Sequence, residues 1–220
     1  TLDASGGLRP WFRSELHGEN GDDSIKGRRG SDTIYGGTGN DTLRAGGGNA
    51  DRVYGEEGDD YLTSRGSGVM WGGVGNDTLD ASSGRHGWLR NELHGDTGND
   101  SIRGSHGSDT LNGGAGNDTL AGGRGVDRFV FNAESGVDVI TDFNARGGEM
   151  IDLVALKLGG GAAPGDGEEN VVGPVFADFK AARISDNADG HAVITLGEGH
   201  RITLIGVAGD DLTAANFAFV

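Results

Sequence analysis

The chain has 220 residues, with 45 glycines, 3 prolines, no cysteine and a formal net charge of −16. The lack of cysteine excludes disulfides and thiolate metal sites, and no apolar run approaches the roughly 20 residues of a membrane-spanning helix. A chain this acidic argues against a nucleic-acid partner, and its self-repulsion requires bound cations.

Residues 1–130 are expected to form short strands, because one large apolar residue recurs at intervals of 8–10 residues, with two intervals of 14. These residues are Leu2, Leu16, Ile25, Ile34, Leu43, Val53, Leu62, Met70, Leu79, Leu93, Ile102, Leu111, Leu120 and Phe129. Residues 1–43 also align with residues 78–120, and Thr1-Leu2-Asp3 recurs as Thr78-Leu79-Asp80. We therefore expect a duplicated block and a chain that begins within a repeat.

Each repeat is interpreted as one three-residue strand with an inward central side chain, followed by a six-residue turn rich in glycine. Two repeats make one coil, and successive coils stack about 4.8 Å apart. Glycine permits positive φ and close backbone approach in the turns. A core this thin does not offset the conformational entropy of so many glycines, so a further stabiliser is needed.

Aspartate stands two residues before the apolar residue in ten of the fourteen repeats: Asp23, Asp32, Asp41, Asp51, Asp60, Asp77, Asp100, Asp109, Asp118 and Asp127. Residues 113–121, GGAGNDTLA, fit the pattern G-G-x-G-x-D-x-U-x, in which U is large and aliphatic. This pattern resembles the calcium-binding nonapeptide of the repeats-in-toxin family. The resemblance implies an all-β fold, a right-handed parallel β-roll with two strands per coil, over residues 1–130.

Carboxylates and turn carbonyls are the hard oxygen ligands that Ca²⁺ prefers. We predict about seven or more calcium ions, because each ion needs a pair of adjacent turns on one edge of the roll. The predicted ligands are the ten aspartates and the turn residues Gly36, Gly39, Gly72, Gly75, Gly113, Gly116, Asn40, Asn76, Asn99 and Asn117. Because folding creates such sites, the free energy of binding is also free energy of folding.

Alternate turns should lie on the same edge of the roll. The odd edge has an aspartate in every turn: Asp23, Asp41, Asp60, Asp77, Asp100 and Asp118. The even edge has Asp32, Asp51, Asp109 and Asp127, but Ser14, Gly68 and Asn91 take the place of aspartate in its other turns. We expect one continuous calcium ladder and one interrupted ladder. In the alternative interpretation, the even edge binds calcium through backbone oxygens.

The even edge also has two enlarged turns, which contain the tryptophans and neighbouring basic residues Trp11, Trp88, Arg9, Arg13, Arg85, His86 and Arg90. One interpretation is a platform on which the rings stack on sugars and the arginines pair with an acidic polysaccharide. In the other, each tryptophan folds back to cover its own bulge, and the arginines balance neighbouring carboxylates.

Residues 131–220 lack the nonapeptide and are expected to form an antiparallel β cap that closes the solenoid. Within and next to this region we expect strands at 128–131, 138–143, 150–153 and 217–220, a hairpin at 191–207, a loop at 159–173 and a short helical turn at 211–216. The stretches 136–144, 151–153 and 211–217 resemble the C-terminal regions of serralysin-type proteases and mannuronan epimerase calcium modules.

That resemblance implies export through type I secretion machinery, although residues 216–220 lack the acidic residue common in serralysin-like tails. It also implies that Asp138 and Asp142 are ligands of the last calcium sites. The alternative is that these two aspartates are ordinary caps at strand ends.

No H-E-x-x-H or G-x-S-x-G motif occurs and the six histidines form no catalytic pattern, so no catalytic residue is predicted. We expect a calcium-binding module that folds outside the cell and serves as the C-terminal secretion and stabilisation domain of a larger exported protein, an enzyme or a toxin. The alternatives are a cell-surface adhesin or polysaccharide-binding module that uses the Trp/Arg edge, and a cryptic enzyme.

Overall fold

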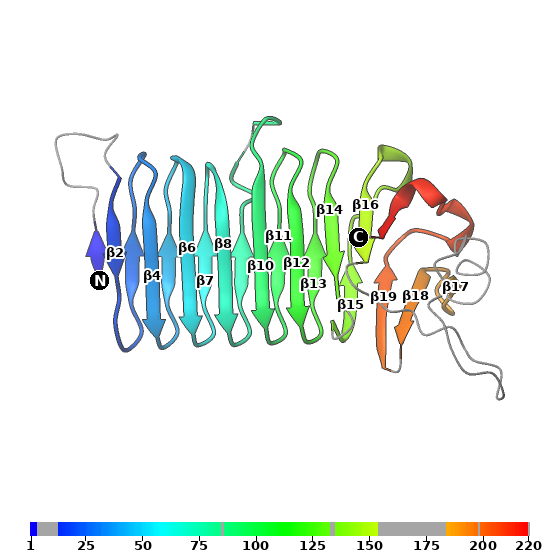
Figure 1. Cartoon of the computed structure of the whole chain (residues 1–220), viewed down its shortest axis with the longest axis horizontal. Helices are drawn as coiled ribbons and strands as arrows, with labels where there is room; N and C mark the ends of the chain where they lie inside the picture. Colours follow the sequence, from blue (N-terminus) through cyan, green and yellow to red (C-terminus); the bar gives the residue numbers. More distant parts are fainter. Residues whose placement is uncertain (4–12, 85, 133–134, 154–183, 198, 220) are drawn as a thin grey trace, which may run out of the picture.

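The computed structural model describes residues 1–3, 13–84, 86–132, 135–153, 184–197 and 199–219. The chain winds into a long, flat roll made of two facing sheets, and each coil adds one strand to each sheet (Figure 1). The odd sheet contains, in spatial order, β1 (Leu2–Asp3), β3 (Ser24–Lys26), β5 (Thr42–Arg44), β7 (Tyr61–Thr63), β9 (Thr78–Asp80), β11 (Ser101–Arg103), β13 (Thr119–Ala121), β15 (Val137–Ile140), β19 (His200–Leu204), β18 (Ala192–Gly197) and β17 (Ile184–Asp186).

The even sheet contains β2 (Glu15–His17), β4 (Thr33–Thr38), β6 (Asn49–Glu57), β8 (Ser67–Val74), β10 (Asn91–Thr97), β12 (Thr110–Ala115), β14 (Arg128–Phe131), β16 (Met150–Leu153) and β20 (Phe217–Phe219). The predicted apolar residues occupy the strand centres and stack in register, as in Ile25 against Leu43 and Leu43 against Leu62. From Ile25 to Phe129 each of them is at most 1% exposed. The predicted strands and the inward direction of their central side chains are confirmed.

A column of aromatic rings lies on the outer face of the even sheet, one residue after the inward side chain of each strand. His17, Tyr35, Tyr54, Trp71 and His94 stack with ring centroids 4.5–5.8 Å apart and interplanar angles of 2–13°. The parallel register places these residues on adjacent rungs. Because the rings cover one another's faces, the column mainly joins the coils and offers few free faces to a ligand.

The two sheets continue past residue 130, where the nonapeptide ends. β15 pairs in parallel with β13, β16 with β14, and β20 with β16. Antiparallel pairing begins only at β17, β18 and β19, which close one end of the roll (Figure 1). The all-β parallel roll and the antiparallel C-terminal cap are therefore confirmed. The division of the chain at residues 130 and 131 stays a prediction, since hydrogen-bonded strands lie on both sides of it.

The hairpin expected at 191–207 is formed by β18 and β19. The helical turn expected at 211–216 is replaced by two short 3₁₀ turns, Gly209–Asp211 (η3) and Ala214–Asn216 (η4), and a third, η2, spans Ala145–Gly147. The loop expected at 159–173 lies outside the described residues. Among the residues that are described, no helix has the length and apolarity needed to cross a membrane.

Candidate metal centre

The aspartates of the odd edge form a continuous ladder of hydrogen bonds. In each step one carboxylate oxygen, Oδ1, accepts the amide of the aspartate one coil earlier, at 2.7–2.9 Å. The ladder runs through Asp23, Asp41, Asp60, Asp77, Asp100, Asp118 and Asp138. Six turns are thus fixed to their neighbours by side chains that the nonapeptide supplies once per repeat.

The second oxygen of these carboxylates, Oδ2, is buried and has no hydrogen-bond partner from Asp41 to Asp138 along this ladder. A buried anionic oxygen without a donor is costly, and such groups are normally paired or bound to a metal. Burial accordingly raises the pKa of Asp60, Asp100 and Asp138 to about 7. Near neutral pH each unpaired oxygen can therefore be neutralised by a proton or by a cation, and a row of cations would let the carboxylates stay ionised.

The first glycine of each turn leaves room beside the unpaired oxygen. A Cβ at Gly36 would overlap Oδ2 of Asp41 and would lie 2.5 Å from the carbonyl oxygen of Gly55 in the next coil. The same holds at Gly72, where the Cβ would overlap Oδ2 of Asp77, and at Gly113 with Asp118. At the fourth turn position Gly39, Gly75 and Gly116 have φ values of 117°, 142° and 138°, which favour glycine.

Calcium takes six to eight oxygen ligands. Among the described residues no three carboxylate or imidazole side chains converge on one point. A cation between two turns therefore has one or two carboxylates available and must take its remaining ligands from backbone carbonyls or water. This donor set contains oxygen alone and fits calcium. The number of ions and the individual ligand roles stay predictions.

The even edge differs from the odd edge in that its ladder is interrupted, as the sequence predicts. Its ladder joins Ser14, Asp32 and Asp51, stops at Gly68, and resumes through Asn91, Asp109 and Asp127. The second oxygen of Asp32 accepts the amide of Arg28, and that of Asp109 accepts the amide and hydroxyl of Ser105. Only Asp51 and Asp127 have an unpaired Oδ2 on this edge. The continuous and interrupted rows of aspartate are confirmed as geometry, whereas their calcium occupancy stays a prediction.

The predicted asparagine ligands form a second, exposed ladder on the odd edge. The side-chain oxygens of Asn40, Asn76, Asn99 and Asn117 each accept a backbone amide of the following coil at 2.8–2.9 Å. Asp59 takes part in the same row. In this structure these oxygens join turns to one another, and their role as calcium ligands is untested.

The two aspartates beyond the repeats differ from each other. Asp138 is fully buried and extends the odd-edge ladder, as a further ligand would. Asp142 is exposed, and its two oxygens accept the amides of Gly122 and Gly123, which is the geometry of a turn cap. Neither observation tests calcium binding directly.

The sequence analysis did not identify Glu149, which is 3% exposed. Burial raises its pKa to about 7, and the nearby carboxylate of Asp142 contributes in the same direction. Burial raises the pKa of Asp127 to about 7, and charge repulsion from Glu149 and Asp142 adds to the rise, so these carboxylates lie near one another at the end of the even edge without converging on one point. No repeat position marks Glu149, and only the folded chain brings it to this edge.

The described parts of the second enlarged turn, residues 81–84 and 86–90, project beyond the neighbouring turns of the even edge (Figure 1). Trp88 is 65% exposed and stacks on His86 with centroids 5.2 Å apart. The interpretation that this tryptophan covers its bulge is therefore wrong. Leu89, which is 1% exposed, does so instead and lies against Gly84 of the same turn. Trp11, Arg9 and Arg85 lie outside the described residues.

Comparison with known proteins identifies the repeat. A family model described as the RTX calcium-binding nonapeptide repeat matches residues 17–49, 45–67, 63–85 and 90–129. No curated protein matches the sequence. Among solved structures, the chain is similar to the extracellular lipase LipA from Serratia marcescens, with 20% identity and a TM-score of 0.44, over 90% of this chain and 40% of the lipase. The chain thus spans less than half the length of that protein.

Proposed function

The chain belongs to the RTX calcium-binding nonapeptide repeat family, and we propose that it is a calcium-triggered folding module that stabilises and exports a larger protein. The observation that carries this proposal is the row of buried, unpaired carboxylate oxygens along the odd edge. Each of them is held in place by a hydrogen bond to the neighbouring coil through its other oxygen. Calcium at these oxygens would therefore tie coil to coil.

The switch would follow from the difference in calcium concentration across the cell envelope. Sites of about 10⁻⁴ to 10⁻³ M affinity are nearly empty at cytosolic calcium and largely occupied at millimolar calcium. Without calcium, the buried carboxylates repel one another and the thin core does not hold the coils together. With calcium, each occupied site adds stability by mass action. The chain would thus stay unfolded for passage through a secretion channel and fold outside the cell.

Export through type I secretion machinery is supported by the resemblance of residues 136–144, 151–153 and 211–217 to secreted calcium modules. The module itself is proposed to be non-enzymatic, with any enzyme or toxin activity in the rest of the parent protein. A passenger protein fused to residues 1–220 should leave cells that carry a type I system. A fusion to residues 1–130, which lacks the C-terminal region, should stay inside the cell. Equal export of both fusions would contradict the role of the C-terminal region.

Calcium-triggered folding is tested by far-ultraviolet circular dichroism of the purified chain, titrated with calcium from a chelated start. Magnesium is the matched control, since it prefers a smaller octahedral site and keeps its waters. We expect a cooperative gain of β-structure with calcium and little gain with magnesium. A chain that is equally folded in chelator would refute the proposal.

A second candidate function, an adhesin or polysaccharide-binding module, is favoured by the exposure of Trp88 and its stack on His86. An exposed indole face is a surface on which a sugar ring can stack. Trp88→Ala should then abolish retention on glycan columns while the calcium titration stays unchanged. Unaltered retention would count against this use of the enlarged turn.

A further inference from the structure

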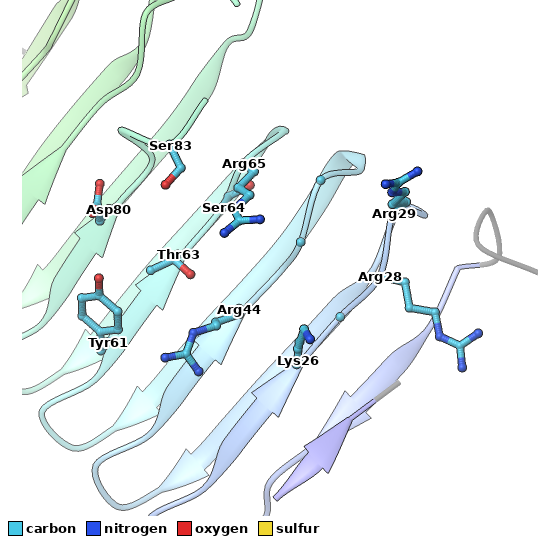
Figure 2. A pocket seen from close by; sticks show the side chains of 13 residues that line it. Lys26, Arg28, Arg29, Arg44, Tyr61, Thr63, Ser64, Arg65, Asp80 and Ser83 are labelled. Atoms are coloured by element: carbon cyan, nitrogen blue, oxygen red, sulfur yellow. The ribbon is translucent and has the colours of Figure 1, made fainter. Parts of the chain in front are cut away.

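A groove of about 790 Å³ lies on the outer face of the odd sheet beside the even edge (Figure 2). Its lining includes five cations in a chain whose net charge is −16: Lys26, Arg28, Arg29, Arg44 and Arg65. None of these cations makes an ion pair or a side-chain hydrogen bond with a described residue. The Nε of Arg28 is even buried without a partner. Positive charge is therefore collected here and left unneutralised.

The groove exists because one coil lacks side chains where its neighbours have arginines. The turn with Gly46 and Gly47 lies between the turn of Arg28 and the turn of Arg65, as the backbone hydrogen bonds from Gly47 to Arg28 and from Arg65 to Gly46 show. A Cβ at Gly47 would meet no atom within 4 Å. The glycines therefore form an open floor between two cationic walls.

The strands extend this charged surface. Lys26 and Arg44 are paired in register on β3 and β5, and both point outward on the side where Arg65 stands at the turn (Figure 2). Cations on neighbouring coils are thus spaced by the separation of hydrogen-bonded strands, about 4.8 Å. A ligand that repeats its negative charges along a chain matches such a row.

The other lining residues suggest which kind of anion fits. Tyr61, which is 39% exposed, and the hydroxyl side chains of Thr63 and Ser83 line the same groove, whereas Ser64 at its edge is buried and its hydroxyl oxygen accepts the amide of Gly66. Hydroxyls and a tyrosine ring suit a saccharide, which has both hydroxyl groups and an apolar ring face. Asp80 is the only carboxylate among the described lining residues and offers an acceptor for a sugar hydroxyl.

We infer that this groove binds an anionic oligosaccharide, one that carries carboxylate or sulfate groups. Arginine forks would pair with these groups, and the hydroxyl residues and Tyr61 would contact the sugar. A single-stranded nucleic acid fits less well, because it binds by stacking its bases and Tyr61 is the only aromatic residue among the described lining residues. A flat anionic membrane would not reach a recessed floor. The inference deepens the second candidate function and locates its site apart from Trp88.

The test is calorimetric titration of the whole chain in saturating calcium with four probes: tetragalacturonate, a heparin-derived tetrasaccharide, maltotetraose and a four-nucleotide DNA. We expect binding of one or both anionic saccharides, which weakens as salt is added, and no binding of maltotetraose. The two anionic probes show whether carboxylate or sulfate is preferred. DNA binding as tight as saccharide binding would overturn the assignment to a sugar, and so would the absence of binding of both anionic saccharides.

Two variants locate the site. Arg44→Glu combined with Arg65→Glu should weaken binding about a hundredfold or more, since the loss of each charge-assisted hydrogen bond costs about 1.4 kcal/mol or more, which is tenfold. Gly47→Glu should weaken it as well, because the new side chain enters open space and places a negative charge on the groove floor. The matched control is Arg103→Glu. Arg103 is exposed and pairs in register with Asp80 on the next strand of the odd sheet, but it does not line the groove.

Circular dichroism in calcium separates loss of the site from loss of the fold. If the double variant fails to fold, the affinity of Gly47→Glu alone decides whether the groove is the saccharide site. Unchanged affinity in folded Gly47→Glu would overturn the inference, as would equal losses in Arg103→Glu. Loss of binding in Trp88→Ala while the groove variants bind normally would assign the saccharide to the enlarged turn instead. A chain that needs no calcium to fold would contradict the proposed function without affecting this result.

Discussion

Replacing Asp100 by asparagine should relieve strain in the calcium-free fold and reduce the stability that calcium adds. In the folded chain Oδ1 of Asp100 accepts the amide of Asp77 at 2.7 Å, whereas Oδ2 is buried without a partner. Asparagine has the same size and keeps an oxygen for the amide of Asp77. It removes the negative charge and puts an NH₂ group, which cannot bind a cation, in the place of the unpaired oxygen.

The magnitudes follow from the burial of this carboxyl group. A pKa raised from 3.8 to about 7 means that ionised Asp100 costs the calcium-free fold on the order of 4 kcal/mol at pH 8. Asparagine relieves this cost. With calcium at about 100 times the dissociation constant, each occupied site stabilises the fold by about 2.7 kcal/mol, and the variant loses at least one complete site. Asp100→Asn should therefore be no less stable than the unsubstituted chain in chelator, and the stability that calcium adds to it should be smaller by about 2–3 kcal/mol.

The assay is urea unfolding followed by circular dichroism, in calcium and in chelator with an osmolyte that keeps part of the population folded. Asp189→Asn, which removes an exposed charge in the turn before β18, is the matched control and should behave as the unsubstituted chain. Equal destabilisation of Asp100→Asn in both conditions would mean that the carboxylate acts only through its hydrogen bond. An unchanged calcium midpoint would refute its role as a ligand.

The same physics leads to three further predictions. Several ladder carboxyls have pKa values raised to about 6 or 7, so the folded chain holds protons that the unfolded chain loses above about pH 4. Without calcium, the folded fraction should therefore rise as the pH falls from about 8 to 5. A lower folded fraction at pH 5 would contradict the burial of these carboxyl groups. In calcium the protons compete with the metal, so the calcium midpoint should rise over the same range. Gly113→Ala, whose Cβ would overlap the carboxylate of Asp118, should lower stability by about 1–3 kcal/mol and raise the calcium midpoint. Gly47→Ala is the control and should leave stability and the calcium midpoint unchanged or slightly improved. Equal effects of the two substitutions would show that the space beside the Asp118 carboxylate is unimportant. Trp71→Ala removes two ring stacks, with Tyr54 and His94, and should lower stability in calcium by about 1–3 kcal/mol in urea unfolding. No loss of stability would show that the aromatic column is incidental.

The sequence by itself determined the roll, because one repeat encodes both the strand and the turn. From Ile25 onward position U of each repeat is buried, and position D, two residues earlier, lies beside the next coil, so Ile25, Leu43 and Asp41 are placed by counting alone. The same counting predicted that Gly68 interrupts the even edge. Such a fold is nearly one-dimensional: each coil contacts its neighbours, and local spacing fixes the contacts.

The features that counting missed depend on which side chains meet across coils or beyond the repeats. Glu149 reaches the even edge only through the path of the chain after β14, and Leu89, in place of Trp88, closes the enlarged turn. The aromatic column and the cationic groove combine residues that are ordinary in their own repeats. Arg28, Gly47 and Arg65 form a groove because stacking places them side by side. The tertiary structure decided these features, since spacing along the chain fixes where a residue lies but not whether its neighbours neutralise, cover or expose it.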